Sequence, residues 1–512
     1  MLVKTFGSAV YGINATTVTV ETNISPGVNF HLVGLPDNAV KESQQRINAA
    51  LKNNGFKIPG KSIVVNMAPA DIRKEGSAYD LTIALGILCA SGQIKGKGVE
   101  DYIIMGELSL DGGLKPIKGV LPIAIQAKKE GFKGLVLPKE NAEEAAVVGN
   151  MEVFGVNSIL EVIDVFNDKC TIEPTVVNIE EDFYANGTNY EFDFSDVKGQ
   201  ENIKRALEIA AAGGHNVILI GPPGAGKSML AKRLPSILPL MSVEEALETT
   251  KIHSVAGKLN RGLGLVTTRP VRAPHHTISD VALVGGGSVP QPGEISMAHN
   301  GVLFLDELPE FKRSVLEVLR QPLEERTVSV SRASFSVEYP ASFMLIAAMN
   351  PCPCGYYNHP EKDCICPPGV VQKYLNKISG PLLDRIDIHI EVTPVSFNEL
   401  SEERESESSA DVRERVVAAR NIQHLRYKKN SSIHCNSQIM PKQLKEICKI
   451  NEEGSGLLKT AIEKLGLSAR AYNRILKVAR TIADLDKSKS IETTHLAEAI
   501  QYRSLDREGW AG

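Results

Sequence analysis

The sequence predicts an α/β fold built around a parallel sheet, and two observations carry this prediction. The apolar run Val217–Ile220 leads into a glycine-rich loop and then into a helical pattern that starts at Met229. Farther along the chain, the apolar run Val302–Leu305 ends in two carboxylates, Asp306 and Glu307. Both patterns are typical of open parallel sheets, whose ligands bind at the carboxyl ends of the strands.

The glycine-rich loop fits the phosphate-binding motif G-x-x-x-x-G-K-[ST]. Its members are Gly221, Pro222, Pro223, Gly224, Ala225, Gly226, Lys227 and Ser228. Backbone N–H groups of such a loop surround phosphate oxygens, and the helix N-terminus that follows adds positive potential. We expect Lys227 to reach the β- and γ-phosphates of ATP and Ser228 to ligate Mg²⁺. A chance glycine turn is the alternative, and the acidic strand end downstream argues against it.

Asp306 and Glu307 predict the second half of a site for nucleotide hydrolysis. Asp306 is expected to hold Mg²⁺, directly or through water, and Glu307 to orient and polarise the attacking water. A strand followed by Asp-Glu has low specificity by itself. Together with the glycine loop, it makes an ATP hydrolase the default prediction.

Length and composition restrict the class of protein. A chain of 512 residues is too long to fold around one hydrophobic core, so about two to four domains are expected. No apolar run reaches the roughly 20 residues of a membrane span, and the N-terminus lacks the apolar core of a signal peptide, so we expect a cytoplasmic protein. The formal net charge of −4 gives no overall basic field, so any contact with nucleic acid must come from a local patch.

Composition shifts divide the chain into four sections. Residues 1–166 alternate between strand and helix patterns, and residues 167–196, which include an acidic run at 180–182, are expected to form a linker. Residues 197–395 contain the nucleotide-binding motifs and a cluster of four cysteines. Residues 396–512 begin with a charged connection and continue as helices in which basic residues are frequent.

The first section shows its elements through periodicity. Strands are expected at Val18–Thr22 and Ile63–Met67, and helices at Val40–Asn53 and Leu81–Ser91.

Three further residues fit a ring-forming ATPase of the AAA+ type. The apolar run Leu345–Met349 ends in Asn350, which is expected to hold the lytic water beside the γ-phosphate. Arg385 follows a helical segment, in the place from which such ATPases reach the γ-phosphate of the neighbouring subunit. Arg470 opens a helix and is similar to the arginine that contacts phosphate across the lid. For each arginine, a surface or salt-bridge role is the alternative.

From end to end the sequence resembles the YifB/ComM-type, magnesium-chelatase-like AAA+ ATPases. The segments that carry the resemblance are Gly34–Asp37 with Val40–Ser43, Asn66–Asp71, Arg272–Thr277, Leu303–Pro309 and Ala348–Gly355. The resemblance implies an AAA+ P-loop ATPase core, an N-terminal Lon-protease-like α+β domain and a C-terminal helical lid domain. It also implies a hexameric ring, and its ComM members imply a DNA branch-migration helicase. Many YifB members have no assigned role.

The Lon-protease-like section lacks the residues of a peptidase. The counterpart of the protease serine segment is Glu75–Leu81, which puts Ser77 or Ala78 at the serine position. An ungapped comparison puts Leu121 where the catalytic lysine belongs. Because leucine cannot take a proton from serine, we expect a non-proteolytic platform for assembly or DNA docking.

Four clustered cysteines predict a structural zinc site. Cys352, Cys354, Cys364 and Cys366 give the spacing C-x-C-x₉-C-x-C. Four thiolates suit a closed tetrahedral Zn²⁺ site and leave no open position for catalysis. The C-x-C spacing is tighter than the usual C-x₂-C, and four free thiols in a loop are the alternative.

Residues 326–337 alternate like a β-hairpin. The segment is similar to a hairpin of chelatases and minichromosome maintenance helicases that carries a basic residue toward the central pore. Arg332 takes that place, and a ring of such arginines would grip a phosphate backbone. A solvated tip is the alternative. A second loop near the pore is expected at Val284–Gly293, and we assign His275-His276, for which the sequence shows no acidic partner, to packing or subunit contact.

The sequence therefore predicts an ATP-driven homo-hexameric motor that acts on single-stranded or branched DNA, with no membrane partner. The alternative is a chelatase-like ATPase that remodels a protein partner. A nucleotide-switched scaffold is a third hypothesis, against which the complete hydrolytic set argues. Arg332 and the basic C-terminal helices favour DNA, whereas the net charge of −4 gives no support.

Overall fold

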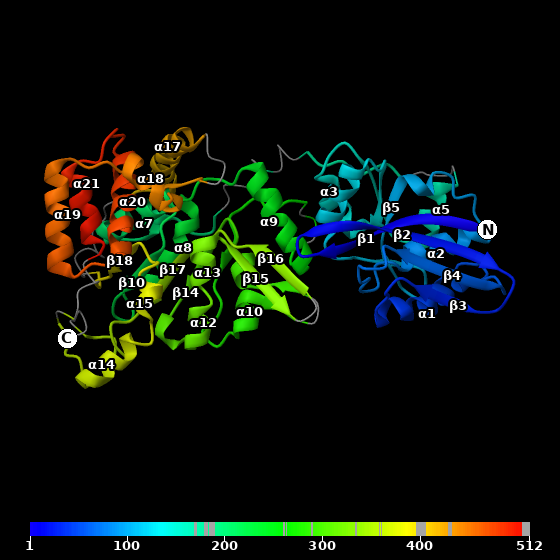
Figure 1. Cartoon of the computed structure of the whole chain (residues 1–512), viewed down its shortest axis with the longest axis horizontal. Helices are drawn as coiled ribbons and strands as arrows, with labels where there is room; N and C mark the ends of the chain where they lie inside the picture. Colours follow the sequence, from blue (N-terminus) through cyan, green and yellow to red (C-terminus); the bar gives the residue numbers. More distant parts are fainter. Residues whose placement is uncertain are drawn as a thin grey trace.

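The computed structural model describes most of the chain, in three consecutive parts along its long axis (Figure 1). The described residues are 1–167, 172–178, 183, 190–259, 262, 264–287, 290–332, 335–357, 359, 361–395, 406–428 and 433–503. The acidic run at 180–182 and the charged residues 402–405 lie outside them. Among the described residues, no helix combines the length and the apolar character that crossing a membrane requires.

The first part is a seven-stranded mixed sheet in the order β3-β4-β2-β1-β5-β8-β9. Its strands are β1 (Leu2–Tyr11), β2 (Asn14–Ser25), β3 (Phe30–Val33), β4 (Ser62–Ala68), β5 (Tyr102–Ile104), β8 (Gly134–Pro138) and β9 (Glu152–Val156). Its main helices are α1 (Asn38–Asn53), α2 (Asp80–Ala90), α3 (Val120–Glu130), α4 (Ala142–Ala146) and α5 (Ile159–Phe166). The predicted strands lie in β2 and β4 and the predicted helices are α1 and α2, so these four predictions are confirmed.

The second part is a five-stranded sheet in the order β11-β14-β17-β10-β18, in which every paired strand is parallel. The strands are β10 (Val217–Ile220), β11 (Val271–Arg272), β14 (Val302–Leu305), β17 (Met344–Met349) and β18 (Ile388–Glu391). Helices α7 (Glu201–Gly213), α8 (Lys227–Ile237) and α9 (Val243–Ala256) are the longest around it. All residues of β10, β14 and β17 are buried, which explains why the sequence shows them as unbroken apolar runs.

Two antiparallel hairpins leave this sheet. β15 (Thr327–Arg332) pairs with β16 (Phe335–Pro340), which confirms the predicted hairpin, and Arg332 is the last residue of β15. The two residues of the tip and the side chain of Arg332 lie outside what the structure describes. The shorter hairpin joins β12 (Gly285–Gly286) to β13 (Gln291–Pro292), within the predicted second loop.

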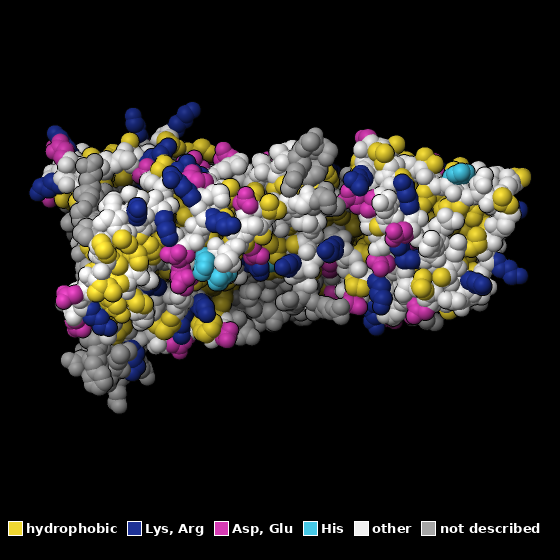
Figure 2. Space-filling model, turned by 90° about the horizontal axis from the view of Figure 1, so that it is seen from below, with side chains coloured by type: hydrophobic (Ala, Val, Ile, Leu, Met, Phe, Trp, Pro, Cys, Tyr) yellow, Lys and Arg dark blue, Asp and Glu magenta, His cyan; other side chains and the backbone are white. Residues whose placement is uncertain are grey.

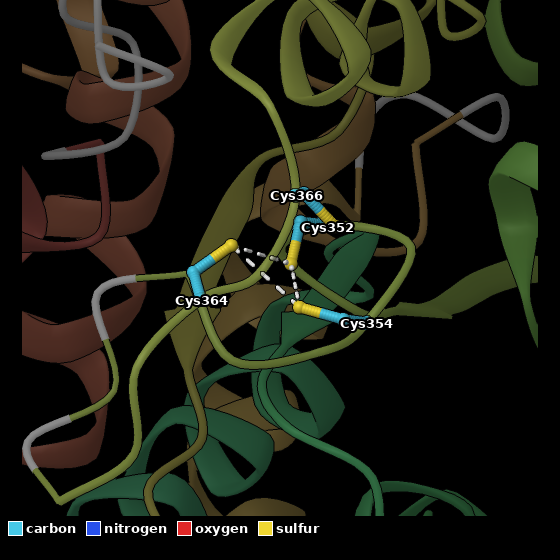
Figure 3. Close-up of side chains that lie close together, drawn as sticks. All are labelled: Cys352, Cys354, Cys364 and Cys366. Atoms are coloured by element: carbon cyan, nitrogen blue, oxygen red, sulfur yellow. Dashed lines mark hydrogen bonds between the residues drawn. The ribbon is translucent and has the colours of Figure 1, made fainter.

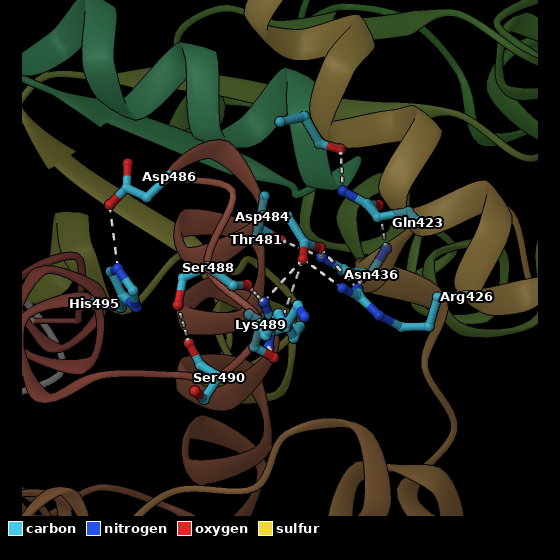
Figure 4. A network of polar contacts seen from close by, with 12 residues as sticks. Gln423, Arg426, Asn436, Thr481, Asp484, Asp486, Ser488, Lys489, Ser490 and His495 are labelled. Carbon is cyan, nitrogen blue, oxygen red and sulfur yellow. Dashed lines mark hydrogen bonds and ion pairs between the residues drawn. The ribbon is translucent and has the colours of Figure 1, made fainter.

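The third part is helical. It comprises α17 (Ser409–Tyr427), α18 (Pro441–Ile447), α19 (Glu452–Leu465), α20 (Ala469–Leu485) and α21 (Thr493–Gln501). A polar network inside it centres on the buried carboxylate of Asp484, which accepts hydrogen bonds from Arg426 (2.8 Å) and Asn436 (2.9 Å) (Figure 4). These helices share one hydrophobic cluster with α7 and the central strands, so the sheet and the C-terminal helices form a single core.

The first part packs on the second through a small apolar cluster. Leu121, at the start of α3, is fully buried there beside Met241 and Ala246 of the second part. Next to them, the buried Glu144 accepts hydrogen bonds from the Leu121 amide (2.9 Å) and from the hydroxyl of Ser254 in α9.

Candidate nucleotide site and cysteine cluster

Parallel strands bring the predicted nucleotide residues to one edge of the central sheet. The loop 221–228 follows β10, Asp306 follows β14 and Asn350 follows β17, and these three strands are neighbours. Their carboxyl ends therefore meet, as the strand patterns predicted.

Lys227 is held inside its own loop. Its Nζ donates hydrogen bonds to the carbonyl oxygens of Gly221 (2.7 Å) and Pro222 (2.8 Å) and to Oδ1 of Asn350 (3.1 Å). Burial lowers the pKa of Lys227, and the nearby Asp306 carboxylate opposes that shift. The contact with Asn350 joins the ends of β10 and β17 at the position where phosphate oxygens would be bound.

Ser228 and Asp306 bring together two oxygen atoms that could hold a metal ion. Ser228 Oγ donates a hydrogen bond to Asp306 Oδ2 at 2.5 Å, and Asp306 Oδ1 accepts from the backbone N–H of Glu307 at 2.9 Å. One hydroxyl and one carboxylate fit the preference of Mg²⁺, which takes few protein ligands and keeps water and phosphate oxygens in its other positions.

Gln200 fixes the loop from outside and was absent from the predicted site residues. Its Nε2 donates to the carbonyl oxygens of Ala225 (2.9 Å) and Thr393 (3.3 Å). Within the loop, Gly224 (φ 79°) and Gly226 (φ 86°) adopt the left-handed backbone that favours glycine, and this conformation turns N–H groups inward.

Glu307 has an acidic–basic contact that the sequence did not show. Its side chain is 60% exposed, and Oε2 lies 3.4 Å from Nδ1 of His276. The His276 ring in turn stacks on His275, with 4.1 Å between centroids. The sequence showed no acidic partner for this histidine pair, whereas the structure supplies one in Glu307. The sequence did not indicate this contact because β11, the strand that precedes the histidine pair at the same edge, is only two residues long and leaves no pattern.

Arg385 lies away from the phosphate loop of its own chain. Its guanidinium donates to the Pro381 carbonyl (2.7 Å) and pairs with Glu324 (2.8 Å), and the side chain is 10% exposed. Its carbonyl oxygen accepts from Asn216, the residue before β10. Lys227 lies beyond the other end of β10. The backbones of Arg385 and Lys227 are therefore separated by about the length of this four-residue strand, roughly 13 Å.

Arg470 lies beside Arg385 instead of beside Lys227. It is in the first turn of α20, is 57% exposed, and its Nη1 lies 3.5 Å from Asp384. The structure thus separates the predicted site residues into two groups. Lys227, Ser228, Asp306, Glu307 and Asn350 share the carboxyl edge of the sheet, and the two arginines lie near the amino end of β10.

The four clustered cysteines converge (Figure 3). Sγ of Cys352 lies 3.3 Å from that of Cys354 and 3.7 Å from that of Cys364, and all four sulfurs, with Cys366, lie within 4.8 Å of one another. Tetrahedral coordination at Zn–S distances of about 2.3 Å puts sulfurs about 3.8 Å apart. The arrangement therefore fits a closed Zn²⁺ site. Within the described part of the chain, no other group of three metal-binding side chains comes together.

The cysteine segment also touches the phosphate loop. Cys352 comes two residues after Asn350, and a Cβ added to Gly355 would lie 2.4 Å from Cδ of Pro223. The segment that would be organised by a metal thus packs directly on the nucleotide site.

In the first part, the two positions that the sequence comparison assigned to a protease serine and lysine have other partners. Ser77 Oγ donates a hydrogen bond to the carboxylate of Glu107, and Leu121 is buried against the second part. Ser77 therefore contacts an acid where a peptidase of this kind needs a lysine.

Comparison with known proteins covers nearly the whole chain. Residues 193–400 match the family model described as magnesium chelatase, subunit ChlI, residues 20–141 match subunit ChlI of Mg-chelatase, and residues 406–503 match the C-terminal ChlI model. The chain is 44% identical to the competence protein ComM of Haemophilus influenzae, over 98% of this chain and 97% of that protein. It is 43% identical to the uncharacterized protein YifB of Escherichia coli, over 98% and 96%. A more distant match is the DNA replication licensing factor mcm7 of Schizosaccharomyces pombe, 27% identical over 38% of this chain and 23% of that protein.

Proposed function

Because the chain belongs to the ComM/YifB-type family of magnesium-chelatase-like AAA+ proteins, we propose that it is an ATP-hydrolysing ring motor that acts on DNA as a ComM-like branch-migration helicase. The observation that supports this most is the set of polar side chains at the carboxyl edge of the central sheet. An amine, a hydroxyl, two carboxylates and an amide there are the groups that a Mg²⁺-dependent ATP hydrolase needs.

Each of these groups has a role in the proposal. Lys227 contacts the β- and γ-phosphates, and Ser228 and Asp306 bind Mg²⁺. When bound, Mg²⁺ would supply charge neutralisation on the phosphate oxygens. Glu307 orients the attacking water and accepts its proton, and Asn350 holds that water in line with the γ-phosphate.

We propose that Arg385 acts on the ATP of a neighbouring subunit in a homo-hexamer. The length of β10 separates it from Lys227 of its own chain, which favours action across a subunit boundary. Arg470 accompanies it as a second phosphate contact, delivered by the C-terminal helices acting as a lid.

We propose that DNA is contacted through the β15–β16 hairpin, with Arg332 at the end of β15. On the face drawn in Figure 2, basic and acidic side chains are interspersed over the described surface, in agreement with the net charge of −4. A local contact in the pore of a ring therefore suits this chain better than an extended basic surface.

The other parts complete the proposal. The cysteine cluster holds one structural Zn²⁺, and the first part is a non-proteolytic Lon-like platform. We place the protein in the cytoplasm.

The family models themselves favour a second candidate, a chelatase-like ATPase that remodels a protein partner. The rate of ATP hydrolysis with single-stranded DNA, with four-way branched DNA and without DNA separates the two. The DNA motor predicts stimulation by DNA that salt weakens. Neither binding nor stimulation at low salt would favour the protein-remodelling candidate.

A further inference from the structure

The segment that bears Arg385 is held by side chains from distant parts of the chain. The backbone carbonyl oxygens of residues 384–386 each accept a hydrogen bond from a side chain. The donors are Nε of Arg474 to residue 384 (2.6 Å), Nδ2 of Asn216 to residue 385 (3.2 Å) and Nη1 of Arg503 to residue 386. Two of the three donors belong to the C-terminal part. The backbone on either side of Arg385 is thus held by residues about 90 to 120 positions later in the sequence.

Asp387 anchors the other side of this segment. Its carboxylate is almost fully buried, forms an ion pair with Arg474, accepts a hydrogen bond from the backbone N–H of Asn216 (2.9 Å) and lies 3.6 Å from His215. Burial alone would raise the pKa of Asp387, but the charge of Arg474 and the contact with His215 hold it well below its usual range. The carboxylate is therefore ionised at neutral pH and available to Arg474.

One guanidinium thus contacts the chain on both sides of Arg385. Nε of Arg474 binds the carbonyl of residue 384, and Nη1 binds the carboxylate of Asp387. Arginine makes two such contacts at once because its donors lie in a rigid plane, whereas the lysine ammonium is a single point of charge. Arg474 is one turn beyond Arg470 on α20, so both arginines face the same segment.

We propose that Arg474 is a positioning residue for Arg385: it fixes the 384–387 segment, from which Arg385, here paired with Glu324, would reach the ATP of the neighbouring subunit. The inference rests on the proposed ring and on the action of Arg385 across the subunit boundary. Arg474 itself touches no nucleotide. Its loss displaces Arg385, and a displacement of about 1 Å lowers a rate by about 10²-fold.

The first measurements concern Arg474→Gln and Arg474→Lys in the full-length protein. We expect kcat for ATP hydrolysis to fall about 10²-fold in Arg474→Gln, with less loss in Arg474→Lys, which keeps the charge beside Asp387. The Kd for ATP is expected to stay unchanged, because Lys227 lies at the other edge of the sheet. Arg415→Gln is the matched control, since Arg415 also ties a C-terminal helix to the sheet part, through Glu208 (2.5 Å), away from Arg385. A loss of ATP affinity equal to the loss of kcat, in both Arg474 variants, would overturn the proposal.

Mixed rings decide between positioning and a role at the subunit's own site. Arg474→Gln subunits mixed with Lys227→Ala subunits should recover hydrolysis, because an intact site then meets an intact Arg385 and Arg474. Arg474→Gln mixed with Arg385→Ala should stay inactive, since neither subunit supplies a correctly placed Arg385. Recovery in this second mixture would show that Arg474 acts at its own site and would overturn the proposal.

A separate mixture tests the premise. Arg385→Ala with Lys227→Ala should recover hydrolysis if Arg385 acts across the boundary. If this mixture stays inactive although mixed rings form, the proposed function fails at Arg385 and the Arg474 inference fails with it. If it recovers and the Arg474→Gln mixture with Lys227→Ala does not, the Arg474 inference alone fails.

Discussion

The hydroxyl of Tyr11, at the end of β1, donates a hydrogen bond to the carbonyl oxygen of Ser336 in β16 at 3.1 Å, across 325 positions of sequence. The turn between β1 and β2 therefore contacts the β15–β16 hairpin, which we propose binds DNA. Ile13 of the same turn packs against the apolar cluster beneath that hairpin. The first part of the chain is thus in a position to influence the hairpin directly.

Gly12→Val tests this contact. A Cβ at Gly12 would lie 2.8 Å from Val337 of β16, so valine should push the turn away from the hairpin. We expect the DNA-stimulated part of ATP hydrolysis to fall while basal hydrolysis persists. Gly55→Val is the matched control, because Gly55 also has a positive φ (82°) but an added Cβ there meets nothing within 4 Å. Equal effects of the two variants would indicate backbone strain alone and contradict a role for the contact.

Glu307→Gln should separate ATP binding from hydrolysis. Glutamine keeps the shape of the side chain but cannot accept a proton, so hydrolysis should be at least about 10²-fold slower. The variant should still bind ATP and accumulate as ATP-bound rings, as measured by nucleotide content and size. Glu310→Gln, which removes a nearby acid that pairs with Lys377, is the control. Near-normal turnover in Glu307→Gln would remove Glu307 from its proposed role.

The cysteine cluster should bind about one Zn²⁺ per chain, as measured by elemental analysis of protein purified without chelator. Cys364→Ser should lower the metal content. Because Gly355 packs on Pro223, it should also weaken ATP binding without abolishing it. Cys89→Ala, at a buried cysteine in the first part, should keep the metal. Metal-free protein with full activity would refute the site.

Arg332→Ala should weaken DNA binding without affecting basal hydrolysis, since Arg332 is not among the nucleotide-site residues. The log–log dependence of DNA affinity on salt should become shallower by about 0.7 for each single-strand phosphate contact that is lost. Lys129→Ala, which removes an equal charge from the end of α3, should leave this slope unchanged. An unchanged slope and undiminished stimulation in Arg332→Ala would remove this residue from the DNA path and favour a protein partner.

The sequence alone predicted those site residues and strands that follow from local patterns of apolar and polar residues. Asn350 and Asp306 were placed near Lys227 because two apolar runs end in these polar residues and a third leads into the glycine loop, and parallel strands align those ends. The β15–β16 hairpin followed from its alternation in the same way.

Contacts between distant segments could not be predicted. His276 reaches Glu307 from a strand too short to leave a pattern, and Arg474 reaches Asp387 from 87 positions away. Leu121 was interpreted only as a missing lysine, whereas its burial against Met241 depends on how two parts of the chain pack. Periodicity carries no information about such packing.

The single core shared by the central sheet and the C-terminal helices restricts how a ring of these chains can move. Sliding those helices over α7 would expose apolar side chains that are now fully buried, such as Ala210 and Ile475. Full burial of one large aliphatic side chain such as Ile475 stabilises the native arrangement by about 1.5–3 kcal/mol, so the displacement of several together is costly. In the proposed hexamer, the movement that follows hydrolysis would thus tilt the sheet and the C-terminal helices of one subunit together against the next subunit. The contacts that change would then lie between chains.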